Sequence, residues 1–192
     1  MIGSVSDSRA HGELREPHRS VEPPALALCA HPDPARSRFS RPFLEALDGG
    51  IFAKKSLAEV YPDWNFDVER EQAELRTTRE LIVVFPIYWY SPPAMLQKWF
   101  EDVFVDRDDF DQTTALTGYR VTFVVSTGGK QEEYEVGGKN GYDVETFLRP
   151  LETSFRYAGA HVLPPVVQYA SWRLEDGDIR DFAARFNAEY TR

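Results

Sequence analysis

Residues 81–93 read Leu81-Ile82-Val83-Val84-Phe85-Pro86-Ile87-Tyr88-Trp89-Tyr90-Ser91-Pro92-Pro93. The apolar run Leu81–Phe85 shows no alternation, which is typical of a parallel strand covered on both faces. Pro86 is expected to end this strand, because proline has no N–H to donate to a ladder. The Pro92-Pro93 pair predicts a helix from Ala94 to about Phe104, since proline is tolerated in a first helical turn.

Three aromatic residues, Tyr88, Trp89 and Tyr90, lie between this strand and this helix. The C-terminal ends of parallel strands face the crevice in which α/β proteins bind their ligands. A row of three aromatic residues at such a place is poorly explained by core packing. We therefore expect a flat ligand beside this turn.

Strand-like and helix-like segments alternate after Pro24, which predicts a parallel sheet between two layers of helices. The expected fold class is α/β, a flavodoxin-like three-layer sandwich with a five-stranded parallel sheet of order 2-1-3-4-5. Residues 25–192 are expected to form this domain, and the polar residues 1–24 a flexible N-terminal extension. The other strands are expected at Ala25–Ala30, within Ile51–Leu57, at Tyr119–Ser126 and at His161–Tyr169, and the other helices at Phe39–Leu47, Asp67–Thr78, Val144–Ala158 and Asp178–Tyr190.

Composition excludes some partners. The formal net charge of -9 and the pI of about 5.0 argue against nucleic acid and anionic membranes, which are bound through excess Lys and Arg. Cys29 is the only cysteine, so no internal disulfide is expected, and its apolar neighbours indicate a small buried hydrophobe in a reducing compartment. Residues 1–24 lack an apolar run and are read as neither a secretory signal nor a membrane anchor.

The loop after the first expected strand carries hydroxyl groups immediately before a helix. Ser37 and Ser40 stand where backbone amides and the helix dipole favour a phosphate. Positive character could come from His31, Arg36 and Arg38. The alternative is that either serine merely caps the helix.

The loop after the fourth expected strand reads Ser126-Thr127-Gly128-Gly129. Paired glycines let backbone amides approach a ligand closely, although they also suit an ordinary turn. Tyr134 could bring a phenolic donor to the same edge, or could simply pack.

Other conspicuous residues are given structural interpretations. The acidic run Asp106–Asp111 could hold a divalent cation but is read as a solvated loop, and no metal site is expected. Trp99 follows helical spacing and is assigned to the core or to a dimer interface.

Several motifs, taken in order, resemble the NAD(P)H:quinone oxidoreductase family. The resemblance covers roughly Leu26 to Tyr169 and is strongest to the branch containing the ancillary flavoproteins of glutathione-regulated potassium efflux systems and the bacterial modulators of drug activity. The motifs are His31-Pro32-Asp33-Pro34 with Ser37, Tyr61-Pro62-Asp63-Trp64-Asn65-Phe66-Asp67 with Glu71-Gln72, Phe85–Ser91 with Lys98-Trp99, Thr127-Gly128-Gly129, and Leu148-Arg149-Pro150-Leu151-Glu152.

The resemblance implies a flavodoxin-like homodimer that holds FMN or FAD without a covalent bond at each subunit boundary. It assigns the flavin phosphate end to His31, Ser37, Arg38, Phe39 and Ser40. It assigns the ring system to Pro86, Ile87, Tyr88, Trp89, Tyr90 and Ser91, and the pyrimidine edge to the amides of Ser126, Thr127, Gly128 and Gly129. Tyr134, which also contacts the cofactor, and Trp89 are the residues expected to serve catalysis.

The chain departs from the family pattern at a few positions. Ser40 stands where the family usually has asparagine, and Asn140 where the mammalian quinone reductases have a histidine assigned to proton relay. An amide cannot exchange a proton at neutral pH as imidazole does. The loop Val105–Thr117 also lacks the usual aromatic-glycine run, so the acceptor is left open.

The leading functional hypothesis is an NAD(P)H-dependent flavoenzyme that reduces quinones or similar flat acceptors by ping-pong, two-electron hydride transfer. An alternative is a flavin-binding ancillary or regulatory subunit of a potassium efflux antiporter, and a third is a carrier of single electrons. The expected location is the cytoplasm, or the inner face of the membrane through a partner.

Overall fold

The computed structural model describes residues 24–106 and 110–190. Nearly all of the predicted N-terminal extension therefore lies outside the described residues, as do residues 107–109 of the acidic run. All strand pairs are parallel and follow the order β2-β1-β3-β4-β5, which confirms the predicted topology. The strands are β1 (Ala25–Cys29), β2 (Phe52–Ser56), β3 (Glu80–Pro86), β4 (Arg120–Ser126), β5 (His161–Val162) and β6 (Val166–Gln168).

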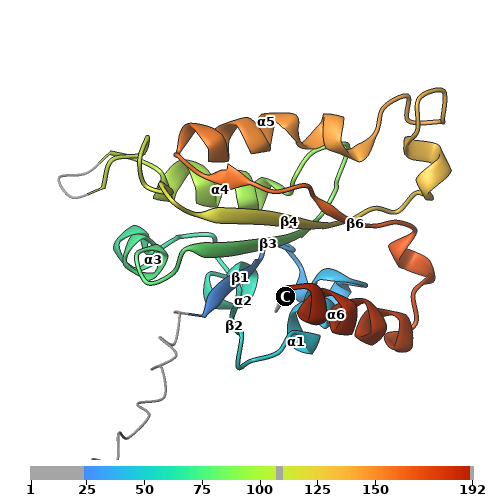
Figure 1. Ribbon diagram of the computed structural model, residues 1–192, viewed down its shortest axis with the longest axis horizontal. Coiled ribbons are helices and arrows are strands. Elements are labelled where there is room, and N and C mark those ends of the chain that lie inside the picture. Colours follow the sequence, from blue (N-terminus) through green and yellow to red (C-terminus); the bar gives the residue numbers. More distant parts are fainter. Residues whose placement is uncertain (1–23, 107–109, 191–192) are drawn as a thin grey trace, which may run out of the picture.

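Helices cover both faces of the sheet (Figure 1). The helices α4 and α5 lie on one face, and α1 and α6 lie on the other. The short helix α2 and three 3-10 turns were not predicted from the sequence. The helices are α1 (Ser40–Ala46), α2 (Leu57–Val60), α3 (Val68–Leu75), α4 (Ala94–Val103), α5 (Val144–Tyr157) and α6 (Asp176–Tyr190), and the 3-10 turns are η1 (Pro34–Arg36), η2 (Gln131–Tyr134) and η3 (Ser171–Arg173).

The central strand β3 shows why the apolar run does not alternate. Leu81, Val83 and Phe85 belong to the core beneath α4 and α5. Ile82 and Val84 belong to a second core beneath α1 and α6. Because a strand points successive side chains to opposite faces, a sheet covered on both sides needs apolar residues at every position.

Prolines set the boundaries of several elements. Strand β3 ends at Pro86, and α4 begins directly after Pro93, as predicted. The predicted fifth strand is split at Pro164-Pro165 into β5 and β6, and both pieces pair with β4. Since proline cannot donate to a ladder, a proline pair is tolerated only at such an edge.

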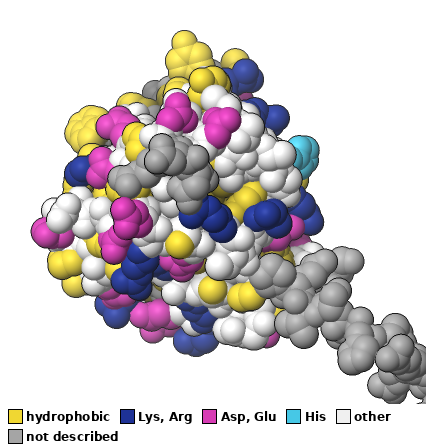
Figure 2. Space-filling model, turned by 90° about the vertical axis from the view of Figure 1, so that its left-hand side faces the viewer, with side chains coloured by type: hydrophobic (Ala, Val, Ile, Leu, Met, Phe, Trp, Pro, Cys, Tyr) yellow, Lys and Arg dark blue, Asp and Glu magenta, His cyan; other side chains and the backbone are white. Residues whose placement is uncertain are grey.

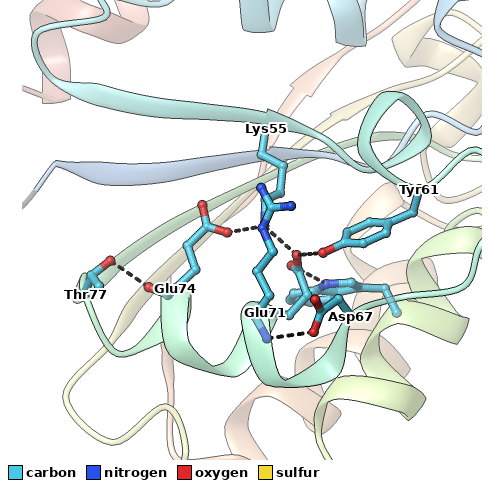
Figure 3. Close-up of polar contacts among 8 residues, drawn as sticks. Lys55, Tyr61, Asp67, Glu71, Glu74 and Thr77 are labelled. Carbon is cyan, nitrogen blue, oxygen red and sulfur yellow. Dashed lines mark hydrogen bonds and ion pairs between the residues drawn. The ribbon is translucent and has the colours of Figure 1, made fainter.

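A buried polar network joins β2, α3 and α4 (Figure 3). The carboxylate of Glu71, 1% exposed, accepts hydrogen bonds from Lys55 Nζ at 2.6 Å and Tyr61 Oη at 2.7 Å. Its other oxygen accepts from Trp99 Nε1 at 2.9 Å. Lys55 also pairs with Glu74. Trp99 is completely buried, so of its two predicted places it occupies the core.

Cys29 is buried in β1. Burial raises the pKa of its thiol to about 11, so the thiol stays protonated at neutral pH. The prediction of a small buried hydrophobe is confirmed.

The two ends of the sheet differ in surface character. Figure 2 faces the end at which the strands begin, where acidic and basic side chains are mixed with scattered hydrophobic ones. Most exposed large apolar side chains of the described residues lie instead in segments that follow β3, β4 and β6, including Trp89, Val136, Tyr142 and Trp172. Among the described residues, no helix is long and apolar enough to span a membrane.

Candidate functional site

Three loops meet where β1, β3 and β4 end, at the right-hand side of Figure 1. Tyr88 Oη, after β3, lies 3.0 Å from His31 Nε2, after β1. The Ile87 amide donates to the Ser126 carbonyl at the end of β4 at 2.8 Å. The structure thus brings the three predicted loops together. A cavity of about 250 Å³ lies between the last two loops, lined by Ile87, Trp89, Tyr90, Gly129, Glu133, Tyr134, Lys139 and Asn140.

The aromatic turn after β3 is a strained two-residue hairpin. Tyr88 and Ser91 exchange backbone hydrogen bonds of 2.9 and 3.1 Å. Between them, Trp89 and Tyr90 have φ angles of 48° and 64°. Such a turn requires positive φ at both central residues and normally contains Asn-Gly. Bulky residues persist in this conformation where the surroundings impose it, and such strain clusters at ligand sites.

Of the two central side chains of the turn, one is packed and hydrogen-bonded and the other is exposed. Tyr90 packs on Phe147 with 4.9 Å between ring centroids, and its hydroxyl donates to Asn140 Oδ1 at 3.2 Å. The Trp89 side chain is 93% exposed. An indole that is held in a strained turn and left in water is poorly explained by stability.

We predict that Trp89→Gly raises the free energy of unfolding by about 0.5–1 kcal/mol, because glycine adopts positive φ without the cost borne by other residues. Little packing is lost, since the indole is exposed. Urea denaturation of the ligand-free protein measures the change. Trp89→Ala is the matched control because it removes the indole but keeps the strain, and equal stabilisation by both variants would contradict the explanation.

His31 links the first loop to the aromatic turn. Its Nδ1 accepts a hydrogen bond from the Asp33 amide at 3.1 Å, so the ring proton resides on Nε2 and faces Tyr88. Burial lowers the pKa of His31, which keeps the ring uncharged at neutral pH. The lowered pKa argues against the expectation that His31 adds positive charge to the loop.

The first loop contains unused hydrogen-bond donors. Ser40 is 1% exposed, and its Oγ has no hydrogen-bond partner among the described residues. In the same set, the backbone amides of Arg38, Phe39 and Ser40 donate no hydrogen bond. Ser37 differs, because its Oγ accepts from the Arg41 amide at 2.9 Å and so caps the start of α1. Ser37 thus has the predicted capping role, whereas the structure shows no such bond for the Ser40 hydroxyl.

The side chains of some predicted site residues are buried in the fold. The Phe39 ring is buried and stacks on Phe43 with 5.3 Å between centroids. Pro86 and Ser126 are the last residues of their strands and are paired in register. Their side chains are buried in the sheet.

The glycine loop after β4 offers amides and a phenol. The amides of Gly128 and Gly129 donate no hydrogen bond within the described parts of the chain. Tyr134 lines the cavity and is 9% exposed. Burial raises the pKa of Tyr134, so its hydroxyl keeps its proton at neutral pH.

Sequence reasoning missed three residues of this region. Glu133 and Lys139 line the cavity, and Trp172 Nε1 donates to the Gly128 carbonyl at 2.8 Å. In the sequence, Glu133 and Lys139 stand out only as charged residues in a charged segment, and such a segment normally indicates a solvated turn. Trp172 is distant in sequence, and no local signal connects it with the loop.

The acidic run does not form a ligand cluster in the parts that are described. Asp106 accepts from the Gln112 amide at 2.8 Å, and Asp111 accepts from the amide and hydroxyl of Thr113 at 2.8 and 2.7 Å. These bonds lower the pKa of the Asp111 carboxyl. No group of three or more His, Cys, Asp or Glu side chains suited to a metal occurs among residues 24–106 and 110–190.

Known proteins resemble the chain over most of its length. An uncharacterised NAD(P)H oxidoreductase of Bacillus subtilis, YrkL, is 32% identical over 83% of this chain and 93% of its own. The glutathione-regulated potassium-efflux system ancillary protein KefF of an Enterobacter species is 30% identical over 84% of this chain and 92% of its own.

Solved structures resemble the model at similar identity. A thermophilic tryptophan halogenase from Streptomycin violaceusniger is 30% identical, with a TM-score of 0.77 over 88% of this chain and 99% of its own. General stress protein 14 of Treponema denticola, in complex with FMN, is 28% identical, with a TM-score of 0.75 over 88% of this chain and 96% of its own. An NADPH-quinone reductase of P. pentosaceus is 27% identical, with a TM-score of 0.74 over 85% of this chain and 95% of its own.

These names cover more than one reaction. The family model described as a flavodoxin-like fold matches residues 25–189, nearly all of the described chain. The chain belongs to this flavodoxin-like family.

Proposed function

We propose that the protein is an NAD(P)H-dependent flavoprotein oxidoreductase that reduces quinones or similar flat acceptors by ping-pong, two-electron hydride transfer. The observation that carries this proposal is the strained turn that holds Trp89 in water beside the cavity. The names of two relatives support it, an NAD(P)H oxidoreductase and an NADPH-quinone reductase. The cofactor is FMN or FAD, and the FMN complex of the Treponema relative favours FMN.

The residues of the site fit a flavin phosphate at the first loop. The buried, unpartnered Oγ of Ser40 and the unused amides of Arg38, Phe39 and Ser40 are donors that a phosphate would satisfy. The exposed Arg38 can contribute charge. Neutral His31 would act by orienting Tyr88.

The same residues fit a flat ring between the second and third loops. Tyr88, Trp89 and Tyr90 offer aromatic surface, and Gly128 and Gly129 offer unused amides. When bound, a flavin supplies the hydride chemistry that amino-acid side chains lack. Amides held in place by the fold stabilise negative charge that develops beside them. Tyr134 keeps its proton and serves as a further donor in the cavity.

We predict that Ser40→Ala weakens FMN binding about tenfold, the loss of one hydrogen bond to a charged group, and leaves riboflavin binding unchanged. Riboflavin is the discriminating ligand because it lacks the phosphate. Ser40→Ala should also leave the ligand-free protein as stable or more stable, since it removes an unpartnered buried hydroxyl. Fluorescence titration of both ligands and urea denaturation measure these effects.

Ser37→Ala is the matched control for Ser40→Ala. It removes the bond to the Arg41 amide and should cost about 1 kcal/mol of stability. Equal losses of FMN and riboflavin affinity in Ser40→Ala would place the phosphate elsewhere.

The proposed activity is tested by the anaerobic absorbance spectrum of the FMN-loaded protein before and after addition of NADPH, with NADH in parallel. We expect the flavin band to bleach and a quinone to restore it. Bound FMN that neither nucleotide reduces would refute the activity.

The KefF relative supports a second candidate function, an ancillary protein of a potassium efflux antiporter. It is compatible with the first, and it would bring the protein to the inner face of the membrane rather than leave it free in the cytoplasm. Co-purification with such an antiporter tests it. We also propose a homodimer, which light scattering at several protein concentrations would test.

A further inference from the structure

The chain after β6 holds the glycine loop in a fixed orientation. Residues 170–172 donate a hydrogen bond to each of three consecutive carbonyls, those of residues 127–129. The right-hand end of Figure 1 shows the two segments side by side. The bonds run from the Ser171 amide to the Thr127 carbonyl (2.9 Å), from the Trp172 indole Nε1 to the Gly128 carbonyl (2.8 Å) and from the Ala170 amide to the Gly129 carbonyl (2.8 Å).

Fixing a carbonyl also fixes the N–H of the same peptide. In a trans peptide the C=O and the N–H point in opposite directions, and no cis peptide occurs among the described residues. The amides of Gly128, Gly129 and Lys130 therefore point away from residues 170–172. These three amides donate no hydrogen bond in the described structure, and Gly129 lines the cavity beside Trp89 and Tyr134.

The middle peptide depends on a side chain. A backbone amide holds the Thr127 carbonyl, and a backbone amide and the Thr127 hydroxyl hold the Gly129 carbonyl. The Gly128 carbonyl is held by the indole N–H of Trp172. A peptide between two glycines has few steric restraints, so this one bond decides its orientation.

The Trp172 indole is itself supported. The Arg173 guanidinium lies 4.6 Å from its ring centroid. Ala170 has a φ of 50°, a left-handed conformation that is costly for alanine and that the surroundings impose. The Trp172 side chain is 58% exposed, so packing explains its position poorly.

We propose that Trp172 is a positioning residue that aims the Gly129 amide at the carbonyl edge of the flavin ring. The inference rests on the proposed function, because it takes the cavity to hold the flavin. A donor aimed there stabilises the negative charge that reduction places on that edge. It therefore favours reduced over oxidised flavin.

The test is Trp172→Phe in the FMN-loaded protein. This variant keeps a ring beside Arg173 and removes only the N–H. We expect the affinity for reduced FMN, relative to oxidised FMN, to fall about tenfold, which lowers the midpoint potential by about 30 mV. The potential is measured by chemical reduction against a reference dye, so it needs no nicotinamide. Trp172→His, which keeps a ring N–H, should recover part of the potential.

Other outcomes separate this inference from the proposed function. If Trp172→Phe has the same midpoint potential as the original protein, the positioning role is overturned. This holds even if its affinities for oxidised and reduced FMN fall equally, since a merely structural residue affects both forms of the flavin alike. A lowered potential in a protein that NADPH cannot reduce would support the positioning role and refute the nicotinamide activity. Failure of the original protein to bind either FMN or FAD would overturn both.

Discussion

Glu71→Gln is expected to lower the free energy of unfolding by about 3–5 kcal/mol, the cost of breaking a buried ion pair from one side. The carboxylate accepts hydrogen bonds from Lys55 and Tyr61 on one oxygen and from Trp99 on the other. All three partners are donors. A glutamine must turn its NH₂ group toward a donor in either orientation, and it also removes the buried one of the two carboxylates that pair with Lys55. Urea denaturation measures the loss.

Glu74→Gln is the matched control for this prediction. Its side chain is 32% exposed and pairs with the same Lys55 amine (Figure 3). Water can replace part of that interaction, so we expect a loss of about 1 kcal/mol or less. Lys55→Met combined with Glu71→Gln should recover part of the single-variant loss, because the buried Lys55 charge, left with only the partly exposed Glu74, is removed as well. Equal losses at Glu71 and Glu74 would show that burial does not set the strength of the network.

Gly138→Ala is expected to disrupt the wall of the cavity and to lower the free energy of unfolding by about 2–3 kcal/mol. A Cβ at this position would lie 2.5 Å from the Glu132 carbonyl oxygen and 2.9 Å from that of Glu133. Backbone atoms cannot move away as a flexible side chain can, so the segment has to shift. Asn140, whose amide bonds to the Glu133 carbonyl at 2.9 Å, would shift with it. FMN affinity should fall about tenfold or more, because the cavity loses its shape.

Gly177→Ala makes the same chemical change where a Cβ meets nothing within 4 Å. Position 177 lies in α6, so alanine should raise stability by about 0.5–1 kcal/mol. Denaturation and FMN titration of both variants provide the comparison. Unchanged stability and affinity in Gly138→Ala would mean that the loop adapts and that the close packing is unimportant.

The fold was predictable because its signals are local. The apolar run of β3 and the prolines that bound it are evident in short stretches. The short turns η1, η2 and η3 were missed because each has only three or four residues, too few for a periodic pattern. The split of the fifth strand followed from Pro164-Pro165, which lack the donors a continuous strand needs.

The candidate site was predictable only in outline. Strand order placed the loops after β1, β3 and β4 together, because parallel strands end at the same edge of the sheet. Residue identity left the roles of Ser37 and Ser40 open, and the structure separated a capping hydroxyl from an unpartnered one. It also indicated that burial lowers the pKa of His31, an effect of the neighbours that surround the ring.

The sequence by itself determined the layered sheet, the strand order and the edge at which a flat ligand is expected, because periodicity, proline and glycine act within a few residues. Only the tertiary structure decided how Glu71 is satisfied, that Trp89 stands in water and that Trp172 holds Gly128. Those features join residues far apart in the chain. Hydrogen bonds and burial are set by distance in space, which a sequence does not record.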